Sequence, residues 1–584
     1  MTTIRGTRSR IALLSLGALA LLLALVAATP LFLSGDLVRE RVVARLEAAT
    51  GTAVRMSRSH VTLFPRPRVV MENVRLDLAT DTSLKAAEAR IDRLEVDVAW
   101  LPVLRGRIEP ANLTAVRPHV KLHDADPAAL AVRMRETAWP DVTVTDGRVE
   151  WHVHKSARKR TALVSAVEAT LVVDMPGVTA QGSAVWNGEP VRFDLSTADL
   201  PKLITARAPF TATIEASPVT LSFDGRTGLV GGEAKGTMRV ATPSLERAAA
   251  WLNLPLDARD LPTVPLSLAG EIVRHGDGLT FETARVMVDG REGEGSLDIS
   301  WTEGLGRGGL ALDGLALGGT LAFDAVAWTP RVQTLPAWSR LLGRLDLDLR
   351  LSAGSARWGE MVLSDVAATL RSEDDTVALD VTEARLGTGR ARGRFRLHPE
   401  HRHAWTMGEA EVALSNIDLI ALAPLLPAEA PRLTGTGDLT ADLTVPLKPD
   451  ATMRDWRGRI TLAARNGTVE RFDLRRAARA ARHRLLPRQE EVWTRATPFT
   501  RLDAAVEIGD GGADLSEAKL VGPRLSAGLA GRIELEGGGI ALSGSVTDRE
   551  RDGSDSFFVG GTVTTPLLVP TGTIAPPPQA FRGG

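Results

Sequence analysis

The stretch Leu345-Asp346-Leu347-Asp348-Leu349-Arg350-Leu351 alternates without a break between leucine and a charged residue. Successive side chains of a β-strand point to opposite faces of the sheet, so this pattern predicts a strand with one buried and one solvated face. The same period of two recurs, with one slip, in residues 69–78 and again in residues 142–153. The chain is therefore predicted to be mostly β and built from one-faced strands.

Glycine recurs at a fixed place in this pattern, directly before two or three alternating residues. The glycines concerned are Gly236, Gly270, Gly295, Gly319, Gly343, Gly393, Gly458, Gly531 and Gly561. Between Gly270 and Gly343 they are 25, 24 and 24 residues apart, which fits a unit of two or three strands joined by tight turns. We expect these glycines to begin the strands of an elongated antiparallel sheet rather than a strict solenoid.

The composition excludes several kinds of chemistry. The chain of 584 residues has a formal net charge of -1 and no cysteine. The net charge gives no reason to expect a nucleic-acid partner. Without thiols there is no disulfide framework, no thiolate nucleophile and no Cys-ligated zinc. No nucleotide-binding, metalloprotease or serine-hydrolase motif occurs, so we expect a non-enzymatic protein without a cofactor.

The N-terminal region contains an apolar run of 23 residues without a formal charge, residues 11–33. As a helix it would be about 35 Å long, enough to cross a hydrocarbon layer of about 30 Å. Its apolar residues include Ile11, Leu14, Leu22, Leu25 and Leu33. Because arginines and no acidic residues precede the run, we expect a single-pass anchor with a cytoplasmic N-terminus. The alternative is a cleaved signal peptide, for which Val26-Ala27-Ala28 offers small residues.

Short helices are expected at residues 36–50, 244–252, 334–342 and 473–486. Ser244 is the expected cap of the second helix. Only the last of these helices is strongly basic, and four of its arginines are candidates for contact with phospholipid headgroups or an acidic partner. They are Arg475, Arg476, Arg479 and Arg482. The alternative is a solvated helix with Glu490 and Glu491 as counter-charges. The chain from Pro570 onward is expected to be disordered.

Two other groups of polar residues are candidate sites. Two histidine pairs have the i, i+2 spacing of one strand face, His152 with His154 and His401 with His403. They are interpreted as surface histidines rather than metal ligands, because no third ligand is indicated. Asp346 and Asp348 are interpreted as part of a solvated face rather than a catalytic carboxylate pair.

Several short segments, in order along the chain, resemble the AsmA family of bacterial envelope proteins. In the N-terminal half they are Val61-Thr62-Leu63-Phe64-Pro65-Arg66-Pro67, Glu72-Asn73-Val74, Arg117-Pro118-His119-Val120 and Val144-Thr145-Asp146-Gly147. In the C-terminal half they are Arg465-Asn466-Gly467, Thr497-Pro498-Phe499, Gly522-Pro523-Arg524-Leu525 and Phe557-Phe558-Val559-Gly560-Gly561.

The resemblance implies a protein of outer-membrane biogenesis, anchored in the inner membrane with its bulk in the periplasm. It implies a curved antiparallel sheet, groove or taco-like, that handles or transfers phospholipid along an apolar surface. The chain then divides into residues 1–10 (cytoplasmic), 11–33 (transmembrane anchor), 34–125 (N-terminal module), 126–430 (repetitive β-rich middle), 431–570 (C-terminal module) and 571–584 (disordered tail).

Alternatives remain open at this point. Alternation alone does not distinguish an apolar face covered by acyl chains from one covered by a second sheet or by its own curl. A structural or scaffold protein that binds or regulates outer-membrane assembly factors is the second hypothesis, and a β-helix enzyme acting on polysaccharide is the third. With 25 to 30 strands spaced about 4.8 Å apart, the body would be roughly 120 to 145 Å long.

Overall fold

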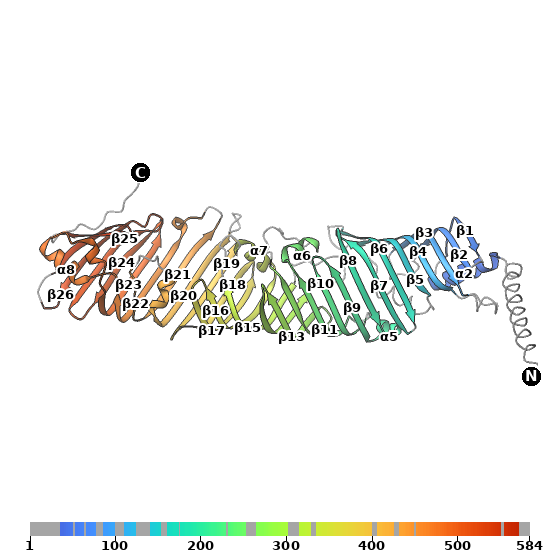
Figure 1. Cartoon of the computed structure of the whole chain (residues 1–584), viewed down its shortest axis with the longest axis horizontal. Helices are drawn as coiled ribbons and strands as arrows, with labels where there is room; N and C mark the ends of the chain where they lie inside the picture. The colour runs from blue at the N-terminus through green and yellow to red at the C-terminus, as the bar shows by residue number, and fades with distance from the viewer. Residues whose placement is uncertain are drawn as a thin grey trace, which may run out of the picture.

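The computed structural model describes residues 35–50, 53–62, 66–77, 86–99, 110–123, 140–153, 160–174, 176–228, 232–252, 264–301, 315–328, 335–399, 406–425, 431–448, 451–550 and 554–571. These residues form one long sheet of 28 strands with a few short helices, as Figure 1 shows. The prediction of a mostly β, elongated architecture with 25 to 30 strands is confirmed. The predicted anchor, residues 11–33, lies outside the described residues. No helix in the described part of the chain is both long and apolar enough to cross a bilayer.

Helix α2 (Gly35–Thr50) precedes the N-terminal part of the sheet. The strands of this part are β1 (Arg58–Thr62), β2 (Arg68–Asp77), β3 (Ala86–Val98), β4 (Pro110–His123), β5 (Asp141–Val153), β6 (Arg160–Asp174), β7 (Gly177–Trp186) and β8 (Glu189–Thr197). The helix expected at residues 36–50 is therefore confirmed. It packs on β1 and β2.

The middle of the sheet carries three short helices, α5 (Leu200–Thr205), α6 (Leu245–Trp251) and α7 (Leu335–Gly343). Its strands are β9 (Ala208–Ala216), β10 (Thr220–Thr227), β11 (Ala234–Thr242), β12 (Leu266–His275), β13 (Gly278–Val288), β14 (Arg291–Trp301), β15 (Leu315–Trp328), β16 (Asp346–Trp358), β17 (Met361–Glu373), β18 (Thr376–Leu386) and β19 (Gly389–Pro399). Ser244 caps α6 by accepting a hydrogen bond from the Arg247 amide, as predicted.

The C-terminal part contains α8 (Leu474–His483), α9 (Gln489–Val492) and the 3-10 helices η3 (Leu419–Leu425) and η4 (Met453–Asp455). Its strands are β20 (Thr406–Asp418), β21 (Thr436–Leu447), β22 (Arg457–Val469), β23 (Thr497–Gly509), β24 (Gly512–Val521), β25 (Leu525–Glu534), β26 (Ile540–Asp548), β27 (Ser554–Gly561) and β28 (Pro566–Thr571). Because Pro570 pairs with Phe557 inside β28, the prediction that disorder begins at Pro570 is wrong. Proline is tolerated there because β28 is an edge strand in the described sheet.

Every strand pairs with the strand that follows it in the chain. The predicted antiparallel pairing is confirmed at most of these pairings and is wrong at two. β4 and β5 run parallel, and so do β15 and β16. Parallel neighbours need a crossover connection of about a dozen residues or more, and the connection between β15 and β16 contains α7.

The prediction that the recurrent glycines begin the strands is wrong. Most lie inside strands, where the neighbouring backbone comes too close for a side chain. A Cβ on Gly295 would lie 1.9 Å from the carbonyl oxygen of Thr320, and a Cβ on Gly270 would lie 2.2 Å from that of Thr283. The register between β12 and β13 shifts beside Gly270, which marks a β-bulge. These glycines therefore allow the strands to bend sharply in the middle.

Left-handed residues mark similar bends elsewhere in the sheet. Asn73 in β2, Arg117 in β4, Asp146 in β5 and Asn416 in β20 all have φ between 49° and 53°, although none is a glycine. The register of β5 and β6 shifts beside Asp146, and that of β20 and β21 shifts beside Asn416. A bulge bends its strand and increases the local twist. Many strands of the sheet are therefore bent at one position.

Candidate functional site

One face of the sheet is apolar from strand to strand. Directly paired residues form a row that crosses every strand from β12 to β26 and contains only apolar side chains and glycine. The row consists of Ile272, Phe281, Leu297, Gly319, Leu349, Leu370, Leu379, Phe395, Ala410, Leu443, Gly458, Ile508, Ala513, Ile533 and Ile540. Paired residues point to the same side, so the row is one continuous apolar stripe, which we call the apolar face.

The opposite face is polar and carries ion pairs between neighbouring strands. Asp346 and Asp348 lie exposed on it. The cross-strand ion pairs include Arg371 with Asp348 (3.4 Å), Arg394 with Asp380 (2.6 Å), Arg532 with Asp514 (2.6 Å) and Arg459 with Glu507. The hydrogen bond to Asp380 raises the pKa of Arg394 above its usual range. The sheet is thus amphipathic along most of its length, with its charges facing water.

Helices cover apolar side chains at the two ends of the described sheet. At the N-terminal end, Val42 of α2 is fully buried together with Val69 and Met71 of β2. At the C-terminal end, α8 buries Leu474 and Ala477 in a cluster that includes the apolar side chains of β26 to β28. Both ends therefore have ordinary, well-packed cores.

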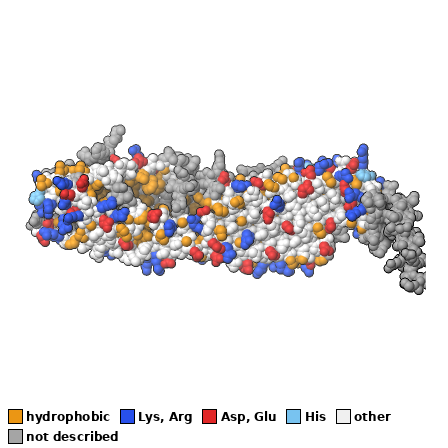
Figure 2. Space-filling view, viewed as in Figure 1, with side chains coloured by type: hydrophobic (Ala, Val, Ile, Leu, Met, Phe, Trp, Pro, Cys, Tyr) orange, Lys and Arg blue, Asp and Glu red, His pale blue; other side chains and the backbone are white. Residues whose placement is uncertain are grey.

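Between these ends the apolar face is only partly covered. Nine apolar side chains around β10 to β16 are half-buried rather than buried. They are Phe223, Met238, Leu268, Leu279, Val286, Ile299, Phe323, Leu349 and Leu351. Figure 2 shows a hollow near one long edge of the C-terminal half, with hydrophobic side chains inside it. The same cluster also contains five buried apolar side chains, Ile272, Phe281, Ala284, Leu297 and Leu321. The middle of the apolar face is therefore partly covered, and part of its apolar surface stays exposed within the described part of the chain.

Phenylalanine rings on the apolar face lie against glycines. A Cβ on Gly293 would stand 2.4 Å from a ring atom of Phe323, and a Cβ on Gly544 would stand 2.3 Å from Phe557. The same arrangement joins Phe193 with Gly182, Phe223 with Gly225, Phe395 with Gly393 and Phe499 with Gly467. Each ring occupies the space above a bare backbone, so it stays close to the sheet instead of projecting from it.

Helices α6 and α7 lie along one long edge of the sheet, and α5 lies along the other (Figure 1). Helix α6 is fastened to the turn between β7 and β8. Asn187 donates a hydrogen bond to the carbonyl oxygen of Trp251 (2.7 Å), and the Trp251 indole donates one to the carbonyl oxygen of Trp186 (2.9 Å). Ala249 of α6 and Leu341 of α7 join one apolar cluster with Leu347 of β16. These helices cover the strand ends rather than the whole apolar face.

The four arginines predicted as a lipid-contact site lie on α8 as expected, but in two different environments. Arg476 pairs with Glu491 of α9, and Arg482 pairs with Asp548 (3.8 Å) and Asp555 (3.4 Å). These two arginines fix α8 in place. Arg475 and Arg479 are exposed, and no carboxylate of the described residues pairs with them. The helix ends earlier than expected, at His483, because Arg484 adopts a left-handed conformation.

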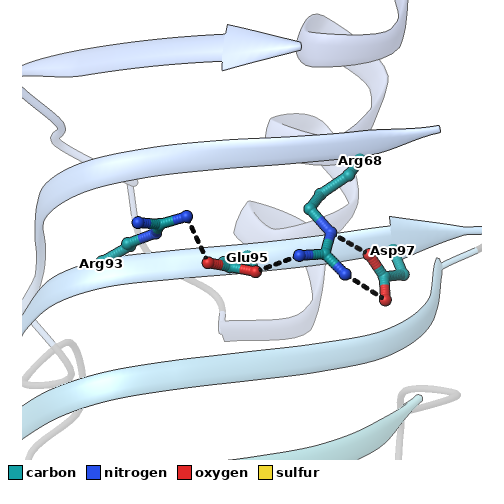
Figure 3. Close-up of polar contacts among 4 residues, drawn as sticks. All are labelled: Arg68, Arg93, Glu95 and Asp97. Atoms are coloured by element: carbon teal, nitrogen blue, oxygen red, sulfur yellow. Dashed lines mark hydrogen bonds and ion pairs between the residues drawn. The ribbon is translucent and has the colours of Figure 1, made fainter. Parts of the chain in front are cut away.

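A compact charge network lies at the N-terminal end of the sheet (Figure 3). Arg68 of β2 binds Asp97 of β3 through two nitrogens, at 2.6 and 3.2 Å, and Glu95 through a third at 2.6 Å. Arg93 also pairs with Glu95 at 2.7 Å. The hydrogen bond to Asp97 raises the pKa of Arg68 above its usual range. Two arginines balance two carboxylates, so we interpret the network as a structural feature that holds β2 against β3.

The remaining polar groups include the predicted histidine pairs and a charged depression. Within the described residues, no three His, Cys, Asp or Glu side chains lie together so as to hold a metal ion. Of the predicted histidine pairs, only the backbone of His152, in β5, falls among the described residues. A depression of about 970 Å³ on the polar face is lined by charges that include Arg394, Glu411 and Arg459. Its basic and acidic residues are equal in number, so it has no surplus charge for an ionic ligand.

No protein-family model matches the chain, and no curated protein matches it. The resemblance to the AsmA family therefore stays a prediction from the sequence.

The contact of phenylalanine with glycine was missed at the level of sequence, although a signal was present. Phe223-Asp224-Gly225 and Gly393-Arg394-Phe395 place the two residues on the same face of one strand. This spacing could have indicated that the glycines leave space for phenylalanine rings on the apolar face and do not begin the strands.

Proposed function

We propose that this protein binds phospholipid acyl chains on the apolar face of its sheet and moves them along it. In this proposal it is a non-enzymatic envelope protein of outer-membrane biogenesis, anchored in the inner membrane with its bulk in the periplasm. The observation that carries the proposal is the uninterrupted apolar row from Ile272 to Ile540, together with the half-buried side chains around it.

The energetic argument starts from the cost of leaving such a surface in water. Removing apolar surface from water contributes about 25 cal/mol per Å², or about 0.8 kcal/mol for each methylene group. Half-buried residues such as Phe223, Met238 and Leu349 leave part of this free energy unused. An acyl chain lying across the strands would bury this remaining apolar surface and so provide the unused free energy, without needing directional bonds. Because an acyl chain is flexible, it can fit a surface of mixed Leu, Val, Ile and Phe side chains.

The corners of the strands support a groove rather than a flat apolar sheet. Bulges beside Gly270 and Asn416, and the left-handed backbone of Asp146, bend strands near their middles. A sheet whose strands bend at corresponding places curls lengthwise, and a curl toward the apolar side would make a trough. Glycines under the phenylalanine rings would keep this trough wide.

The covered ends favour loading of lipid along the length of the sheet rather than through its ends. α2 buries Val42 at one end, and α8 buries Leu474 and Ala477 at the other. With 28 strands spaced about 4.8 Å apart, the array is about 130 Å long. A shuttle or a partial conduit therefore agrees better with this geometry than an open-ended tube.

Two neighbouring positions on β16 provide a test. Leu349 lies half-buried on the apolar face, whereas Arg350 lies exposed on the polar face. A photo-crosslinking amino acid at Leu349 should capture phospholipid from living cells, as detected by mass spectrometry, and the same group at Arg350 should not. Equal capture at both positions, or none at Leu349, would overturn the proposal.

The same experiment addresses the scaffold hypothesis. A scaffold protein would present its polar face to its partner. A crosslink from Arg350 to a protein, with no lipid crosslink from Leu349, would therefore favour a scaffold that binds outer-membrane assembly factors.

A further inference from the structure

Two of the three most exposed large apolar side chains among the described residues lie side by side at the C-terminal end of the sheet. Leu485 is 65% exposed and Leu486 is 73% exposed. They follow α8 directly and precede α9. Elsewhere in the described chain, leucines of comparable exposure are scattered singly, as at Leu425 (65%) and Leu567 (45%). We call residues 484–488 the tip.

The backbone at the end of α8 holds this tip outward. Arg484 adopts φ 52°, and the Leu485 amide donates a hydrogen bond to the carbonyl oxygen of Ala480 (3.1 Å). This is the geometry of a helix that ends in a left-handed turn, after which an apolar residue usually packs back on the helix. Leu485 does not pack back in this way, because most of its surface is exposed.

The helix behind the tip is firmly attached to the sheet. Asp473 caps α8 by accepting a hydrogen bond from the Arg476 amide (3.0 Å). Leu474 and Ala477 are buried, and Arg482 is paired with Asp548 and Asp555. The two exposed leucines are therefore held by a helix that is fixed to the sheet.

Exposed arginines lie along α8 and on both sides of the two leucines in the sequence. Arg475, Arg479, Arg484 and Arg488 are all exposed. Residues 470–495 contain eight arginines and four acidic residues, although the whole chain has a net charge of -1. Figure 2 shows Lys and Arg side chains gathered over this end of the molecule, where Figure 1 places α8. The tip thus combines a pair of exposed leucines with a surplus of positive charge.

We propose that the tip docks the C-terminal end of the sheet on an anionic phospholipid bilayer. The two leucines enter the interface between headgroups and acyl chains, and the arginines contact phosphate groups around them. Leucine burial supplies affinity that depends little on salt, whereas the arginines supply preference for anionic lipid. This inference goes beyond the proposed function, because a protein could dock in this way without carrying lipid on its sheet.

The form of the tip favours a bilayer over an acidic protein. Leu485 and Leu486 protrude from a short loop and form no groove or strand edge into which a peptide could fit. A bilayer accepts a protruding apolar pair of any shape, and arginine side chains near its surface reach the phosphates. A protein partner would need a matching pocket, so it is kept as an outcome of the test.

The absence of cysteine from the sequence allows a local test on the full chain. A single Leu486→Cys substitution is labelled with an environment-sensitive fluorophore, and the protein is mixed with vesicles. We expect the emission to increase and shift to the blue with phosphatidylglycerol-containing vesicles, but not with phosphatidylcholine alone. The matched control is Val362→Cys, whose side chain is 46% exposed in β17, and its label should not respond.

Two variants separate the contributions in the labelled background. Arg475→Glu with Arg479→Glu should raise the vesicle concentration needed for half-maximal response by about 25-fold or more, since each basic residue contributes about fivefold. Leu485→Ser should raise it by about tenfold or more. Arg239→Glu, on an exposed position of β11, should leave the response unchanged.

Three outcomes would overturn the docking proposal. The label at position 486 could stay silent with both kinds of vesicle, or it could respond in the same way as the label at position 362. It could also stay silent with vesicles but respond to poly-L-glutamate, which would point to an acidic protein instead. None of these outcomes bears on lipid capture at Leu349, so the two proposals fail independently.

Discussion

The ring of Phe323 fills the space that a side chain on Gly293 would need. The two residues are direct partners on β14 and β15, and a Cβ on Gly293 would lie 2.4 Å from Cε1 of the ring. Only glycine at this position lets the ring lie against the sheet. The depth of the apolar face is therefore set jointly by the aromatic residue and the glycine beneath it.

Gly293→Ala should destabilise the sheet around β14 and β15. The new methyl group forces the Phe323 ring away from its position, and overpacking of this kind costs about 1 to 3 kcal/mol. Since a long array opens locally, the effect should be measured by hydrogen exchange of the amides in β14 and β15, which should become about tenfold faster.

The control for this prediction is Gly528→Ala in β25. A Cβ there would meet only the Ser545 hydroxyl, at 3.6 Å. Exchange in β25 should slow or stay unchanged. Equal acceleration in both variants would show that loss of glycine itself, and not contact with the ring, causes the effect.

Ala477→Leu should loosen α8 from the end of the sheet. Ala477 is fully buried, so the larger side chain has no space. We expect a cost of about 1 to 3 kcal/mol, seen as faster exchange in α8, β27 and β28. Arg479→Leu adds the same side chain at an exposed position of the same helix and should leave exchange unchanged. If both variants behave alike, α8 is not held by close packing at Ala477.

Ser372→Ala should weaken the attachment of the start of β16, which follows α7, to β17. The Ser372 hydroxyl accepts a hydrogen bond from the Leu347 amide (2.9 Å) and donates one to the carbonyl oxygen of Leu345. Alanine leaves both buried groups without this partner, at a cost of about 1 to 3 kcal/mol. Exchange in β16 and β17 is the measurement, and Ser352→Ala, at an exposed position of β16, is the control. No difference between the two variants would contradict the prediction.

Arg68→Met should weaken the pairing of β2 with β3 by about 0.5 to 1 kcal/mol, because an ion pair near the surface contributes little. Arg68→Lys keeps the charge but loses the two-nitrogen contact with Asp97, so its effect should be intermediate. The difference from the unmodified protein should shrink at high salt. A difference that stays constant with salt would assign the effect to packing of the arginine stem.

Local features of the fold could be predicted from the sequence where neighbouring residues determine them. The alternation around Leu347 and Leu349 correctly predicted a strand with one apolar face. Ser244 is the cap of α6, and α8 begins where the basic helix was expected. In each of these cases the deciding interactions lie within a few residues of one another.

Features that depend on distant partners were not predictable in this way. The role of Gly295 depends on the carbonyl oxygen of Thr320 in the next strand, and so on a register that the local sequence does not contain. Arg482 is paired with Asp548 and Asp555, so the helical pattern alone could not separate it from the exposed Arg479. The parallel pairing of β16 with β15 likewise depends on the crossover connection that contains α7.

The pairing of every strand with its predecessor has a consequence for how the protein is made. A growing chain can add each new strand to the edge left by the previous one, so assembly can keep pace with synthesis and no strand waits for a distant partner. During this process the newest edge is always open to a wrong partner. In the last described strand, β28, Pro566 and Pro570 occupy two of the six positions and have no N–H to donate, so this strand offers fewer donors to a further strand. Proline in an edge strand thus lowers the tendency of the described sheet to pair with another chain.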